Sequence, residues 1–165
     1  MSRIDPNDGS KLVVFKASDY FNGHPSEAST LCDKPTISSG TLGMAMHPNF
    51  SVDSTAFIYY YYSYNHGTPS APDTRFKIRR LKWDATSQTI IDSTDLVTNV
   101  MSEYGHVGGR LLIAEQNNKP YLFLSVGDYG ISETNSPSCY LDQANNPNNF
   151  TQDVSTQNGK IHRFN

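Results

Sequence analysis

Short apolar segments bounded by turn residues recur along this chain, and long stretches of helical periodicity are absent. Apolar segments of this length, separated by Gly, Pro, Asn and Asp, are typical of β-strands. The pattern predicts a turn over residues 4–9 and an all-β chain, with strands at 11–16, 41–46, 56–64, 75–83, 89–100, 110–114, 121–126 and 159–164.

Two of these segments differ in which faces they would bury. Segment 56–64 is apolar on both faces, which is typical of a central strand that is covered on both sides. Segment 75–83 alternates apolar with basic residues, which predicts an outer, half-exposed strand. Arg79 and Arg80 interrupt its period of two, and this predicts a β-bulge. Together, residues 41–100 are expected to form one antiparallel sheet of four strands.

The strand pattern then restarts, and repeated four-stranded units of this length are typical of a β-propeller. We predict one partial propeller domain over residues 1–165. Residues 1–37 would be the end of one blade and a loop, 38–104 one blade, and 105–165 an incomplete next blade. Since each blade buries its faces against its neighbours, about two blades cannot close a ring. The chain is therefore expected to be a fragment whose open blade faces favour self-association.

Composition excludes several classes of partner. The 165 residues carry a net charge of −3, which gives no electrostatic reason to bind nucleic acid. No apolar run is long enough to span a membrane, and the N-terminus is too polar for a signal peptide. Cys32 and Cys139 either form one disulfide or remain two free thiols, and their spacing does not decide between these.

The most specific chemistry lies around two glycine-rich turns. His106 opens the first, which ends at Arg110, and Asp128 lies in the second. A histidine held by such a turn can act as a general base, and a carboxylate can fix its orientation. His106 and Asp128 are therefore predicted to be a proton-abstracting pair. Alternatively, Gly108 and Gly109 serve only backbone geometry around a satisfied histidine, and Asp128 caps its own turn.

Six segments, in order, resemble the soluble quinoprotein glucose dehydrogenases and the wider glucose/sorbosone dehydrogenase family. They are GTLGMAMHPNF (40–50), YYSY (61–64), IRRL (78–81), HVGGRL (106–111), VGDYG (126–130) and GKIHR (159–163), so the resemblance covers about residues 38–165. It implies a six-bladed propeller, of which this chain supplies roughly two blades. Such proteins use pyrroloquinoline quinone (PQQ), usually with calcium, and oxidise the anomeric hydroxyl of an aldose.

The resemblance also implies roles for single residues. His106 would take the hydroxyl proton while hydride passes to the quinone, and Asp128 would orient His106. An external acceptor would then take the electrons. The family's calcium ligands and quinone-holding cations lie on later blades, so this chain is expected to hold no metal. Family members are usually periplasmic or extracellular, and that environment would permit a disulfide between Cys32 and Cys139.

Three positions depart from the family pattern. Gly105 stands where the family often has Asp, and Ser38 and Glu133 stand where Gln is expected. These positions line the sugar and quinone side of the family's site, so together with Arg110 they are candidate substrate- or cofactor-binding residues. The departures leave the sugar open. They also favour an alternative, in which the chain is a non-catalytic propeller binding module or an inactive fragment.

Overall fold

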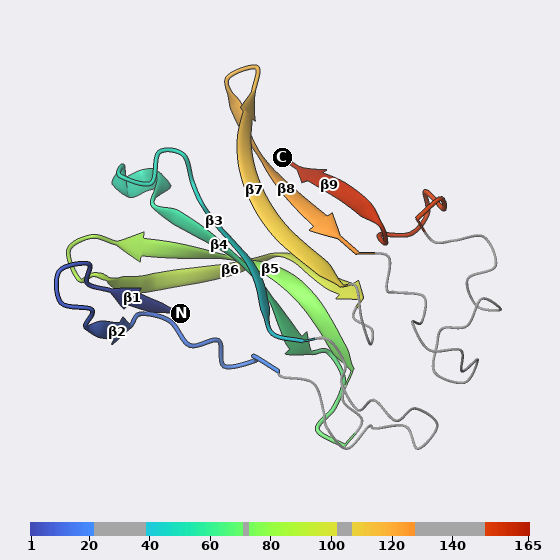
Figure 1. Ribbon diagram of the computed structural model, residues 1–165, viewed down its shortest axis with the longest axis horizontal. Helices are drawn as coiled ribbons and strands as arrows, with labels where there is room; N and C mark the ends of the chain where they lie inside the picture. Colours follow the sequence, from blue (N-terminus) through green and yellow to red (C-terminus); the bar gives the residue numbers. More distant parts are fainter. Residues whose placement is uncertain (22–38, 71–72, 102–106, 128–150) are drawn as a thin grey trace.

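The computed structural model describes residues 1–21, 39–70, 73–101, 107–127 and 151–165, which form antiparallel sheets (Figure 1). The strands are β1 (Ser2–Ile4), β2 (Lys11–Val13), β3 (Thr41–Met46), β4 (Phe57–Asn65), β5 (Thr74–Asp84), β6 (Thr89–Met101), β7 (Gly108–Gln116), β8 (Lys119–Val126) and β9 (Lys160–Phe164). A short 3₁₀ turn, η2 (Asp53–Thr55), precedes β4. The strand orders are β1-β2, β3-β4-β5-β6 and β7-β8-β9, so the two larger sheets have four and three strands.

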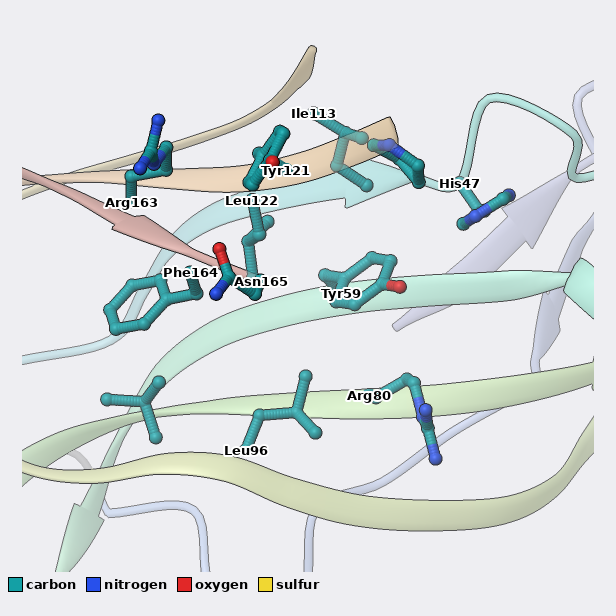
Figure 2. Close-up of a pocket in the computed structure, with 12 residues that line it drawn as sticks. His47, Tyr59, Arg80, Leu96, Ile113, Tyr121, Leu122, Arg163, Phe164 and Asn165 are labelled. Atoms are coloured by element: carbon teal, nitrogen blue, oxygen red, sulfur yellow. The ribbon is translucent and has the colours of Figure 1, made fainter. Parts of the chain in front are cut away.

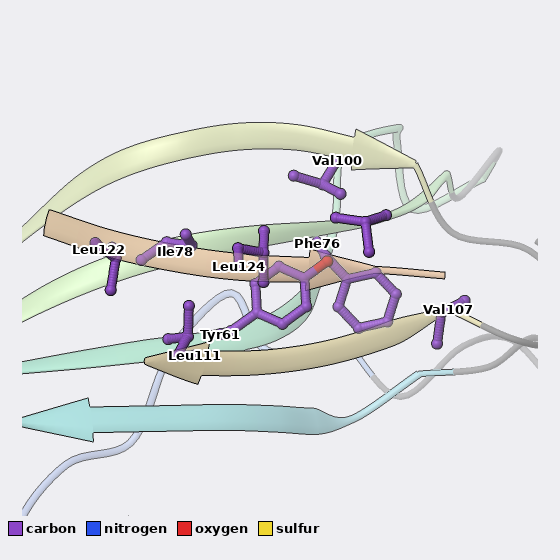
Figure 3. Close-up of a cluster of buried hydrophobic side chains, with 9 residues drawn as sticks. Tyr61, Phe76, Ile78, Val100, Val107, Leu111, Leu122 and Leu124 are labelled. Atoms are coloured by element: carbon purple, nitrogen blue, oxygen red, sulfur yellow. The ribbon is translucent and has the colours of Figure 1, made fainter. Parts of the chain in front are cut away.

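The main hydrophobic core lies between the two larger sheets (Figure 3). Tyr61, Phe76 and Ile78 enter it from the four-stranded sheet and are fully buried. Leu111 and Leu124 enter it from the three-stranded sheet. Because β3 and β7 also contact each other, the sheets pack as neighbouring layers, as successive propeller blades do.

A second core covers the other face of the four-stranded sheet. It contains the buried residues Ile58, Tyr60, Tyr62, Tyr64 and Leu81, and Phe15 packs against it from the N-terminal segment. Strand β4 therefore has apolar neighbours on both faces and lies between β3 and β5. This confirms the prediction of a central strand, and the order of β3 to β6 confirms the predicted four-stranded antiparallel sheet.

The prediction that residues 75–83 form an outer, half-exposed strand was wrong. Strand β5 lies between β4 and β6, and Lys77 is only 4% exposed. The lysine is buried because carboxylates of Asp19 and Asp95 accept hydrogen bonds from its ammonium group. The pairing of β5 with β6 shifts between Ile78 and Arg79, but the unpaired residue there is Leu96 of β6, and β5 pairs with β4 without a shift through Arg79 and Arg80. The bulge predicted within residues 75–83 therefore lies on the partner strand instead.

The N-terminal hairpin was predicted in part. The backbone N–H of Gly9 donates to the carbonyl of Asp5 at 2.9 Å, which closes the predicted turn. The turn joins β2 to β1, a strand that the sequence pattern did not reveal because all three of its residues are exposed. Strand β2 ends at Val13, shorter than the predicted segment 11–16.

Some predictions fall outside the described residues. The proposed blade boundaries at 37/38 and 104/105 lie there, as do Cys32 and Cys139, so the domain limits and the cysteine pairing stay predictions. Across the described part of the chain, no helix is long and apolar enough to cross a membrane.

Candidate functional site

The candidate site lies where β7 begins and β8 ends. The backbone N–H of Gly127 donates to the carbonyl of Val107 at 3.1 Å, and the N–H of Gly159 donates to the carbonyl of Gly127 at 2.8 Å. These two hydrogen bonds extend the three-stranded sheet past its last strand pair, Gly108 with Val126. Val107 is 7% exposed and belongs to the core between the sheets (Figure 3). The three backbone segments are thus fixed together at one edge, which we call the glycine edge (Val107, Gly127 and Gly159).

Two glycines at the start of β7 have no room for a side chain. Gly108 has φ +65°, and a Cβ there would lie 2.6 Å from the backbone nitrogen of Gly127. Gly109 has φ +129°, and its Cβ would lie 2.4 Å from the Cβ of Leu42 in the neighbouring sheet. L-residues rarely adopt such φ values. The glycines therefore let β7 approach both β8 and the neighbouring sheet at the edge where the chain enters from His106.

Arg110 is the predicted site residue that the structure describes. The pairing of β7 with β8 shifts between Gly108 and Leu111, so Arg110 lies in a β-bulge. Its backbone N–H donates to the hydroxyl of Ser125 at 3.1 Å, and the residue is exposed. Bulges of this kind often re-aim a side chain beside a functional site. Arg110 therefore presents a cation near the glycine edge.

The other predicted site residues are not described. Ser38, Gly105, His106, Asp128 and Glu133 all lie outside the described residues, so their proposed roles stay predictions.

Asn158 is a further candidate that the sequence did not reveal. It precedes Gly159, is 2% exposed, and its side-chain nitrogen has no hydrogen-bond partner among the described residues. A buried amide donor without a partner is costly, so such groups deserve a functional explanation. Its backbone carbonyl accepts a hydrogen bond of 2.8 Å from the ammonium group of Lys160. The burial of Asn158 depends on the fold, so no local sequence signal could identify it.

A second group of charged residues lies away from this edge, on the other side of the four-stranded sheet. Lys77 and Arg79 of β5 contact the carboxylates of Asp19 and Asp95, and the hydroxyl of Tyr62 donates to Asp19 at 2.8 Å. Burial raises the pKa of each carboxyl. This effect of burial is outweighed by hydrogen bonds, which Asp19 accepts from Lys77 and Tyr62 and Asp95 accepts from Arg79 and Lys77. Both pKa values therefore lie below the ordinary range. This acid–base cluster (Asp19, Lys77, Arg79 and Asp95) is neutral overall and is best explained as structural.

No group of three or more His, Cys, Asp or Glu side chains that could hold a metal ion occurs among the residues described. Calcium is therefore not assigned to any of them.

The chain matches a known protein family over nearly its whole length. The family model described as Glucose / Sorbosone dehydrogenase covers residues 12–165. Quinoprotein glucose dehydrogenase B from Acinetobacter calcoaceticus is 26% identical over 132 residues, which are 78% of this chain and 24% of that protein. The chain thus spans about a quarter of this curated relative.

Solved structures with the same fold include two aldose sugar dehydrogenases. The match to the soluble aldose sugar dehydrogenase of Escherichia coli, in its apo form, covers 99% of this chain and 37% of that chain, with a TM-score of 0.59 and 16% identity. The match to the PQQ-bound aldose sugar dehydrogenase of Streptomyces coelicolor also covers 99% of this chain and 37% of that chain, with a TM-score of 0.54 and 22% identity. These similarities confirm the predicted fold class, part of a β-propeller with antiparallel blades.

Proposed function

Because the chain belongs to the glucose/sorbosone dehydrogenase family, we propose that it is part of a PQQ-dependent sugar dehydrogenase that oxidises the anomeric hydroxyl of an aldose. The family match over residues 12–165 carries this proposal. The quinoprotein relative supports the redox chemistry, and the PQQ-bound structure of a protein with the same fold supports the cofactor. Since the chain spans about a quarter of that relative, the activity is proposed for the whole protein.

The glycine edge supports a joint role for His106 and Asp128. Val107 directly follows His106, and Gly127 directly precedes Asp128. The 3.1 Å hydrogen bond between Val107 and Gly127 therefore connects the backbone positions adjacent to both residues. We assign His106 as the base that takes the proton of the anomeric hydroxyl. Asp128 would hold the imidazole in the tautomer that can accept this proton.

PQQ, when bound, supplies the quinone that accepts hydride from the sugar carbon. The described residues fit part of such a site. Arg110 is an exposed cation near the glycine edge, and Asn158 is a buried amide donor with no described partner. These donors suit the carboxylates and carbonyls of a quinone acid, so we propose them as contacts on this side. Ser38, Gly105 and Glu133 are proposed to line the sugar and quinone side as well.

The calcium ligands and the remaining cations are proposed to lie on propeller blades outside this chain. An external acceptor would then receive the electrons. Location in the periplasm or outside the cell belongs to the same proposal, as does self-association through open blade faces.

The test is His106→Gln in the whole protein, supplied with PQQ and calcium. Loss of a general base should lower kcat by about 10²–10⁴-fold, while calorimetric uptake of PQQ is retained. His66→Gln is a matched control, because His66 is exposed in the loop between β4 and β5, where it contacts Asp73. Aldose oxidation that survives His106→Gln at the rate of the control would refute the role of His106.

A non-catalytic binding module is the second candidate. The departures at Ser38, Gly105 and Glu133 favour it, because these positions line the sugar and quinone side in the family. Titration of the whole protein with PQQ separates the two functions. A binding module should take up no PQQ at any calcium concentration, whereas a dehydrogenase should take it up.

A further inference from the structure

A pocket of about 480 Å³ lies between the two larger sheets (Figure 2). Pro120 and Tyr121 of its lining follow the turn between β7 and β8, whereas Val107 and Gly127 lie at the other ends of these strands. A pocket of this volume is large enough for a small organic molecule. Its position separates it from the proposed dehydrogenase site.

The lining combines apolar walls with basic side chains. Leu96 and Ile113 contribute apolar surface, and His47, Arg80 and Arg163 contribute basic groups. None of the described residues that line the pocket is acidic. A concave site lined by basic and by no acidic side chains attracts anions. The pocket should therefore prefer a negatively charged ligand that also has apolar surface.

Arg80 is the cation best placed to bind such a ligand. Its guanidinium lies over the ring of Phe57, 4.5 Å from the ring centroid, and it forms no ion pair with any described carboxylate. Its neighbour Arg79, by contrast, contacts two carboxylates in the acid–base cluster. The aromatic contact holds the guanidinium of Arg80 without neutralising its charge, so its donors remain available to an anion.

Tyr59 and His47 contribute two further donors to the pocket lining. Tyr59 pairs with Arg80 across β4 and β5, and its hydroxyl forms no hydrogen bond with the described residues. Burial raises the pKa of Tyr59 more than the positive charge of Arg80 lowers it, so the phenol stays neutral and can donate. The Nδ1 of His47 accepts the backbone N–H of Asn49 at 3.2 Å. Because Nδ1 accepts this bond, Nε2 is the ring nitrogen that can donate to a ligand.

We propose that this pocket binds a small organic carboxylate with an aromatic or aliphatic body. The carboxylate would accept hydrogen bonds from Arg80, Tyr59 and His47. The body would pack against the apolar wall that includes Leu96 and Ile113. A sugar acid fits less well, because hydroxyl groups placed against an apolar wall lose hydrogen bonds to water without replacing them.

Calorimetric titration of the whole protein with benzoate, gluconate and inorganic phosphate tests this proposal. Benzoate should bind, and gluconate and phosphate should bind at least several-fold more weakly. Arg80→Gln should weaken benzoate binding about ten- to hundred-fold, since it removes a charged donor. Lys11→Gln is the matched control, because Lys11 is an exposed cation of β2 outside the pocket lining. It should leave binding unchanged.

Tyr59→Phe provides a second variant that keeps the ring and removes the hydroxyl. It should weaken benzoate binding several-fold, and it decides the outcome if Arg80→Gln lowers the melting temperature so far that the chain unfolds. No uptake of benzoate by the folded chain would overturn the proposal. So would equal affinity for benzoate and phosphate, or wild-type affinity in both pocket variants. Neither PQQ nor sugar takes part, so failure here is distinct from failure of the proposed dehydrogenase.

Discussion

Asp19→Ala tests whether the acid–base cluster fastens the N-terminal segment to the four-stranded sheet. Asp19 accepts hydrogen bonds from Lys77 at 2.6 Å, from Arg79 at 3.0 Å and from the hydroxyl of Tyr62 at 2.8 Å. Lys77 is the most buried member, with a side chain that is 5% exposed. Removal of Asp19 leaves two cations sharing the single carboxylate of Asp95, so the cluster gains a net positive charge in a partly buried place.

The expected cost follows from these contacts. Loss of one partner of a fully buried ion pair costs about 3–5 kcal/mol, whereas an exposed pair contributes about 0–1 kcal/mol. The side chain of Asp19 is 32% exposed while that of Lys77 is 5% exposed, so the cluster lies between these limits. We expect Asp19→Ala to lower the free energy of unfolding by about 2–3 kcal/mol. In the double variant Asp19→Ala/Lys77→Met, part of this loss should be recovered, because no buried ammonium is left unpaired.

Urea denaturation followed by circular dichroism measures both variants, with Asp53→Ala as the control. Asp53 is an exposed carboxylate of η2 that forms no ion pair with a described residue, and its replacement should change stability by less than about 0.5 kcal/mol. Equal unfolding free energies for Asp19→Ala and the control would refute the assignment of a structural role to the cluster.

The same cluster predicts a pH dependence. The pKa values of Asp19 and Asp95 lie below the ordinary value in the folded chain. Their stabilising contribution is therefore complete above the unfolded-state pKa of about 4, and it is lost as the pH falls through the lower, folded-state values. Wild-type stability should fall more steeply with acidification than that of an Asp19→Ala/Asp95→Ala variant. Parallel acid profiles would contradict this.

Two further predictions concern packing between the sheets. Gly109→Ala should lower the unfolding free energy by about 1–3 kcal/mol, because the new Cβ would lie 2.4 Å from the Cβ of Leu42. Thermal melting checks this, and Gly9→Ala, at φ +73° and with no atom within 4 Å of its Cβ, should cost less. Leu124→Ala should lower the unfolding free energy by about 2–5 kcal/mol, because Leu124 is fully buried. Urea denaturation measures this, and Leu112→Ala is the control: Leu112 lies on the same pair of strands but is 58% exposed, so its replacement should have a small effect.

The strands of the two larger sheets could be predicted from sequence because their signal is local. Alternation or runs of apolar residues place β3 to β9 within a few residues of their observed bounds. Strand β1 carried no such signal, since its residues Ser2–Ile4 are exposed. The burial of Lys77 was not predictable either, because its partner Asp19 lies 58 residues away. A strand in which apolar and basic residues alternate is expected to have exposed basic side chains, unless acidic residues elsewhere in the chain are known to contact them.

The candidate site was predictable in its motifs and not in its surroundings. The glycines at 108 and 109 indicated a constrained turn, but the close approach of Gly109 to Leu42 depends on how two sheets pack. Asn158 likewise became a candidate only through its burial beside Gly159. Contacts between residues far apart in sequence decide both features, and a local pattern carries no information about them.

The basic residues of β5 show why charge alone does not identify a binding site. Lys77 and Arg79 lie on the face that meets the N-terminal segment, where Asp19 and Asp95 neutralise them. Arg80 and Lys82 pair with Tyr59 and Phe57 on the opposite face.

There, both cations lie over the ring of Phe57, at 4.5 and 5.0 Å from its centroid, and the ion pairs of the described residues include neither. Successive side chains of a strand point to opposite faces, so the cations on one face of β5 are neutralised by carboxylates and those on the other face are not. If a ligand anion binds the cations that have no carboxylate partner, benzoate should raise the melting temperature of the wild-type chain. It should leave that of Arg80→Gln unchanged, because binding stabilises only a folded state that can bind.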